Sequence, residues 1–131
     1  MTDQMIDLAR RAVACEGFRW MPGMRGVDVE NGGYARRQDD GRSGLMPWHA
    51  YDHCVIEDLL PDLTDPATLG CVLALVREAW GKPLLYVEPV NDEIDGLAWY
   101  VWEDSTAWSL SRGPLRSEAE ALVAALEAAP C

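Results

Sequence analysis

Residues 49–54, HAYDHC, place two histidines four positions apart, with an aspartate before the second and a cysteine after it. Imidazole, carboxylate and thiolate all bind transition metals, and residues four apart share one face of a helix. The segment is therefore a candidate centre for a small metal-dependent or thiol enzyme. Its four side chains are His49, Asp52, His53 and Cys54.

Two features of the surrounding sequence oppose this centre. Pro47 lies only two residues before His49, so a helix would have to begin almost on the first histidine. No CxxC and no second HxxxH supplies further zinc ligands. If the segment is a strand instead, His53 and Cys54 point to opposite faces and cannot form a thiol–imidazole pair. We therefore favour ordinary structural histidines and expect no metal.

The chain contains no other recognisable catalytic signature. It has no GxSxG, no GxxxxGK[ST] and no GxGxxG, and its glycine-bearing stretches GRSG and NGGY contain no lysine. Acid pairs such as Asp39-Asp40, Glu57-Asp58 and Asp92-Glu93-x-Asp95 could hold magnesium, but solvated turns are the simpler interpretation. We expect no catalytic residues and no cofactor.

Charge is distributed unevenly along the 131 residues. Residues 1–44 hold seven basic and seven acidic side chains, whereas residues 45–131 hold four basic and fifteen acidic ones, so the later part carries the whole net charge of −11. Such a field opposes direct binding to nucleic acid or to an anionic membrane and favours a basic protein partner.

The chain contains six tryptophans, which is more than a chain of this size is expected to bury. An exposed tryptophan beside carboxylates is typical of a protein interface, and we expect Trp20, Trp48 and Trp102 to be exposed. The predicted partner-binding residues are Asp92, Glu93, Asp95, Trp102, Glu103 and Asp104.

Three segments show helical spacing. Residues 3–15 repeat apolar positions at helical intervals. Thr2 or Asp3 can cap the start of this helix, and Gly17 ends it. Residues 66–80 form the strongest helix, with Asp65 at the N-cap, Pro66 at the first position and Gly81 at the end. Ser117 and Glu120 form a capping box before a third, shorter helix.

The remaining segments alternate in the manner of strands. Short strands are expected on either side of the Pro22-Gly23 turn, and Asn31-Gly32-Gly33 predicts a hairpin that leads into an edge strand, YARRQ. Three strand candidates follow the strongest helix: LLYVEPV, LAWYVWE and TAWSLS. Residues 45–60 are ambiguous between helix and strand. Short turns require antiparallel pairing. We predict a single α+β domain over 1–131, with about three helices and five to six strands in one curved antiparallel sheet.

The ends of the chain and its cysteines suggest a compartment. No apolar run approaches the ~20 residues that span a bilayer, and the N-terminal MTDQMIDLARR lacks the apolar stretch of a secretory signal. The four cysteines show no framework spacing, so we expect reduced thiols and no disulfide. The expected location is the cytosol.

The block PDLTDPATLGCVLALVREAWG resembles a recurring segment of small uncharacterised accessory proteins of bacteriophages and prophages from GC-rich bacteria. FRWMPGMR and SEAEALVAALEAAP fit the same pattern, and the three stretches cover about a third of the chain. The resemblance implies a phage-type accessory protein acting in the host cytosol. It transfers no ligand or catalytic residue.

Three functional hypotheses follow from these observations. The first is a non-catalytic binding protein whose acidic surface mimics nucleic acid and docks on a basic host protein, such as a CRISPR complex or nuclease of host defence. The second is the small enzyme centred on His49, Asp52, His53 and Cys54. The third is a phage housekeeping protein that self-associates, for example as a homodimer. We favour the first.

Overall fold

The computed structural model describes residues 2–30, 32–36, 59–94, 96–103 and 115–130, with the backbone alone at 35, 36 and 92. Among these residues three helices and five strands make an α+β domain, as predicted. No helix in the described ranges has the length and apolar character needed to cross a bilayer. In chain order the elements are α1 (Asp3–Ala14), β1 (Arg25–Asp28), β2 (Gly33–Arg36), β3 (Leu59–Pro61), α2 (Pro66–Trp80), β4 (Tyr86–Asp92), β5 (Gly96–Trp102) and α3 (Glu118–Ala128).

Each helix begins at the cap that the sequence predicts. The side chains of Thr2, Asp65 and Ser117 accept hydrogen bonds from the backbone N–H groups three residues ahead, which lack partners inside the helix. α2 ends at Gly81, whose φ of 65° is the left-handed conformation that glycine adopts without strain. The capping box of α3 is only half formed, because Glu120 accepts from the N–H of Arg116 rather than from that of Ser117.

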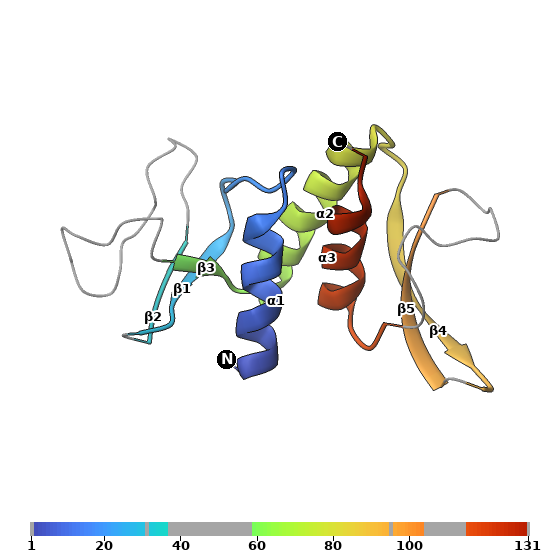
Figure 1. Cartoon of the computed structure of the whole chain (residues 1–131), viewed down its shortest axis with the longest axis horizontal. Helices are drawn as coiled ribbons and strands as arrows, with labels where there is room; N and C mark the ends of the chain where they lie inside the picture. The colour runs from blue at the N-terminus through green and yellow to red at the C-terminus, as the bar shows by residue number, and fades with distance from the viewer. Residues whose placement is uncertain (1, 31, 37–58, 95, 104–114, 131) are drawn as a thin grey trace.

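The strands form two antiparallel sheets among the described residues. One sheet has the order β2-β1-β3, which places β2 at an edge as predicted, and the other is the β4–β5 hairpin. Figure 1 shows the three helices between these two sheets. The prediction of one curved sheet is therefore wrong in this respect, although the α+β class and the antiparallel pairing are confirmed. The sheets are separated because α2 follows β3 directly and carries the chain across the helical layer before β4 begins.

The segment between α1 and β1 also differs from its prediction. Alternation at Phe18 and Trp20 suggested a short strand, but residues 18–20 are irregular. The two rings pack edge to face, with centroids 5.8 Å apart and planes at 82°. Both side chains are half-buried against the core, so packing accounts for the apolar pattern without strand pairing.

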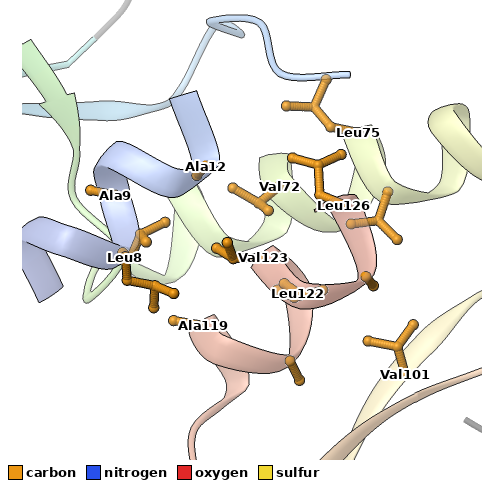
Figure 2. Packing of buried hydrophobic residues seen from close by; sticks show 14 of the residues in the cluster. Leu8, Ala9, Ala12, Val72, Leu75, Val101, Ala119, Leu122, Val123 and Leu126 are labelled. Carbon is orange, nitrogen blue, oxygen red and sulfur yellow. The ribbon is translucent and has the colours of Figure 1, made fainter. Parts of the chain in front are cut away.

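The core lies where the helices meet the β4–β5 hairpin. α3 contacts α1, α2, β4 and β5, so most of its surface is covered. Figure 2 shows Leu122 and Leu126 of α3 among side chains from α1, α2 and β5. The labelled members of this cluster are Leu8, Ala9, Ala12, Val72, Leu75, Val101, Ala119, Leu122, Val123 and Leu126.

The three helices point their C-terminal ends the same way. In Figure 1 each runs from the lower to the upper part of the molecule, so the ends of α1, α2 and α3 lie near one another. The indole N–H of Trp80, at the end of α2, donates to the carbonyl of Ala125 in α3 over 2.8 Å. A guanidinium in the last turn of α1, Arg11, contacts Glu127 in the last turn of α3. Helix C-termini carry partial negative charge, so this arrangement gathers three such ends at one pole.

Candidate functional site

Four of the six predicted partner-binding residues lie in or beside the β4–β5 hairpin, at its two ends. Asp92 pairs with Gly96 at the tip and Glu93 follows it, whereas Trp102 pairs with Tyr86 at the base and Glu103 comes next. Six residue steps along β5 separate tip from base, roughly 20 Å of extended chain. Asp95 and Asp104 fall outside the described residues. The hairpin therefore presents two separate groups rather than one patch.

The base of the hairpin is already engaged within the fold. Lys82 Nζ lies 2.5 Å from Glu103 Oε2, and both side chains are about one-third exposed. Trp102 is half-buried, with its ring centroid 5.3 Å from that of Tyr100. Its indole nitrogen is buried and finds no hydrogen-bond acceptor within the part of the chain that the structure describes. The expectation that Trp20 and Trp102 are exposed is wrong, because both are half-buried, and Trp48 lies outside the described residues.

Most of the described acids in the later part of the chain also make contacts inside the molecule. Asp62 is buried, accepts hydrogen bonds from the backbone and side chain of Thr64, and lies 3.7 Å from Arg25 Nε. The others perform helix capping or pair with cations. They are Asp65, Glu78, Glu103, Glu120 and Glu127. A large share of the negative charge thus stabilises the fold, and Glu93 at the hairpin tip remains an exposed acid.

Exposed apolar side chains concentrate in the same hairpin. Five large apolar or aromatic side chains are exposed among the described residues, and four of them lie between Leu84 and Leu97. At the tip, Ile94 is 91% exposed and Leu97 55%, while at the base Leu84 is 70% exposed. The fourth is Tyr86, and the fifth, Val13, lies on α1. This feature was missed from the sequence, although an isoleucine within a polar turn was the available signal.

Pro89 interrupts the outer edge of β4. The N–H of Trp99 donates to Leu115 O over 2.8 Å and so points away from β4. In an antiparallel ladder, two directly opposite residues direct their backbone N–H and C=O groups either both toward the partner strand or both away from it. Pro89 is opposite Trp99. Pro89 therefore occupies an outward-facing position, where its missing N–H costs no ladder hydrogen bond and removes a donor from the edge.

The structure leaves the HAYDHC centre untested. His49, Asp52, His53 and Cys54 all lie outside the described residues, as do Asp39-Asp40 and Glu57-Asp58. Within the described ranges, no three side chains of histidine, cysteine, aspartate and glutamate come together in a way that could hold a metal ion.

A groove of about 510 Å³ opens at the pole where the three helices end. Its walls come from residues 14–17 at and after the end of α1, from Ala79 of α2, and from Leu126, Glu127, Ala129 and Pro130 at the end of α3. A Cβ at Gly17 would be crowded where these walls meet, because it would lie 3.1 Å from Leu126 Cδ1 and 3.2 Å from the Cβ of Ala79. Glu16, Glu127 and Arg11 line the groove.

Two ionisable groups of the groove, Arg11 and Cys15, have shifted pKa values. Hydrogen bonds that the Arg11 guanidinium donates to the Glu127 carboxylate raise the pKa of Arg11 above its ordinary value, so this guanidinium stays charged. Burial, followed by the negative charge of Glu127, raises the pKa of the Cys15 thiol. The Cys15 Sγ donates to the carbonyl of Arg11 over 3.3 Å. At neutral pH Cys15 is therefore a neutral lining group rather than a thiolate nucleophile.

We expect Cys15 to react with iodoacetamide more slowly at pH 8 than an unstructured cysteine peptide does. The thiolate is the reactive form, and a raised pKa leaves less of it at this pH. Mass spectrometry of the Cys15 peptide separates its rate from those of the other cysteines. The rate should rise when urea unfolds the chain, because burial is then lost. A native rate that equals the peptide's, with the same pH midpoint, would contradict the shift.

Comparisons with known proteins add no assignment to this geometry. The chain matches no family model, no curated protein and no solved structure.

Proposed function

We propose that this chain is a non-catalytic protein-binding module that docks on a cationic surface of another protein through its β4–β5 hairpin. The observation that carries the proposal is the concentration of exposed apolar side chains in this hairpin, with Ile94 91% exposed at the tip. Exposed apolar clusters on small domains mark interaction sites, because their burial against a partner is favourable. Glu93 beside Ile94 adds a negative charge next to the apolar contact.

Charge determines which partner the surface suits. A net charge of −11 accelerates encounter with a basic protein and opposes nucleic acid and anionic lipid. A protein surface that ordinarily holds nucleic acid is the natural cationic target. Given the resemblance of the sequence to phage accessory proteins, we extend the proposal to a component of host defence, such as a CRISPR complex or a nuclease.

Removing the apolar tip tests the proposal. The double substitution Ile94→Ser with Leu97→Ser should weaken salt-sensitive capture of a basic protein from bacterial lysate by about tenfold or more, because buried apolar anchors supply most of the energy of an interface. Val13→Ser is the matched control, since Val13 is also exposed but lies on α1, and it should leave capture unchanged. The captured protein is then purified and its affinity for each variant is measured by calorimetry.

Two charge-reversal variants test the electrostatic part of the proposal. Glu93→Lys should slow association and flatten its salt dependence, whereas Glu30→Lys makes the same charge change at an exposed position between β1 and β2 and should do less. Capture that survives the loss of Ile94 and Leu97 side chains, or a wild-type chain that retains no basic protein at low salt, would rule the proposal out.

A further inference from the structure

The groove at the common end of the three helices lies apart from the hairpin and borders the core at Leu126. Its volume of about 510 Å³ falls within the range of small-molecule sites, roughly 300–1,000 Å³. Its lining is mainly aliphatic, with contributions from Ala14, Gly17, Ala79, Leu126 and Pro130. Such a surface fits the methylene chain of a ligand.

The polar surroundings of this groove are predominantly negative. The C-terminal ends of α1, α2 and α3 each contribute partial negative charge, and parallel helices do not cancel one another's dipoles. α3 has no basic residue in its last turn and instead carries Glu127 there. Glu16 adds a second carboxylate. Among the described residues that line the groove, Arg11 is the one cation, and its guanidinium is held by both carboxylate oxygens of Glu127, at 2.5 and 3.2 Å.

From this combination we propose that the groove is a binding site for an aliphatic polyamine. Its methylene segments lie along the alanine, leucine and proline side chains, while its ammonium groups face Glu16 and the three helix ends. Anionic ligands are disfavoured, because Arg11 is already paired with Glu127 and no other cation from the described part of the chain lines the groove. The neutral Cys15 thiol adds bulk without competing charge. This site is independent of the hairpin and of the proposed protein partner.

Spermidine is the probe, titrated into the isotope-labelled full-length chain and followed by NMR. Saturable shifts are expected at the backbone amides of Gly17, Ala79 and Ala129, with none at the hairpin tip near Gly96. N-acetylated spermidine, which has lost one cation, should bind more weakly, and 1,8-octanediol, which has none, should not bind. Added salt should weaken binding, because partly exposed charges are screened.

Matched charge-neutralising variants distinguish specific binding of spermidine in the groove from its general attraction to the negative net charge of the protein. Glu16→Gln should weaken spermidine affinity about two- to fivefold, and Glu16→Gln with Glu127→Gln about tenfold or more, because the second change also frees the Arg11 cation. Glu93→Gln removes the same single charge at the hairpin tip and should change affinity by less than about twofold. If Glu16→Gln and Glu93→Gln weaken binding equally, or if shifts spread over the whole acidic surface, attraction follows net charge and the proposal is overturned. No saturable shift at the groove amides overturns it as well.

Discussion

Replacing Leu122 by alanine is expected to lower the free energy of unfolding by about 2–5 kcal/mol. Leu122 is fully buried at the centre of the cluster that joins the helices to β5 (Figure 2). The change removes buried methyl groups and leaves a cavity that the closely packed neighbours fill only in part. Because domains of this size are stable by only about 5–15 kcal/mol, the loss is a large fraction of the total.

Urea denaturation followed by tryptophan fluorescence measures this effect. The midpoint should fall while the slope stays the same, since the surface exposed on unfolding hardly changes. Leu84→Ala is the matched control, because it deletes the same atoms from a side chain that is 70% exposed, and it should cost less than about 0.5 kcal/mol. Equal losses from the two variants would mean that the α3 cluster is not the core.

Local chemistry made the helices predictable. The cap at Asp65, the proline at 66 and the glycine at 81 act within a few residues of the backbone groups that they satisfy or terminate, so α2 has the predicted bounds. The hairpin turn at Gly32-Gly33 and the strands that flank Gly96 are local in the same sense. For these elements the structure confirms the pattern.

Features that depend on distant residues could not be predicted. Ala121 and Ala125 are completely buried, so α3 is covered on more than one face. α3 packs against α1 and α2 as well as against the hairpin, so small residues are needed where these elements approach closely. The groove has the same origin, because its walls come from three helices whose common direction is set by packing rather than by any segment alone.

The candidate site shows the same limit. The sequence placed acids and tryptophans in the later part of the chain, but it could not reveal which of them the fold would use. Asp65 caps α2, Glu103 contacts Lys82 and Trp102 is half-buried, so burial and pairing withdraw these groups from any partner. The Ile94 side chain, in contrast, is 91% exposed in a turn whose composition looked merely polar. Exposure thus depends on what the rest of the chain covers.

Replacing Thr68 by valine is expected to cost about 1–3 kcal/mol, although valine has nearly the same shape. Thr68 is fully buried in α2, and its hydroxyl has two partners. It accepts from the backbone N–H of Arg25 at the start of β1 over 2.9 Å and donates to Asp65 Oδ2 over 2.8 Å. The hydroxyl therefore joins the three-stranded sheet to the capped end of α2. Valine leaves the Arg25 N–H without its acceptor, and a partly buried donor without a partner is costly.

Thr68→Ser is the control that separates the hydroxyl from the methyl group. Serine retains both hydrogen bonds and loses one buried methyl, for an expected cost of about 0.8 kcal/mol. Hydrogen exchange supplies a second measurement, since the Arg25 amide should exchange much faster in the valine variant and stay protected in the serine variant. If the Arg25 amide is equally protected in both variants, the sheet does not depend on this hydroxyl, and other contacts between β1 and α2 must hold the two elements together.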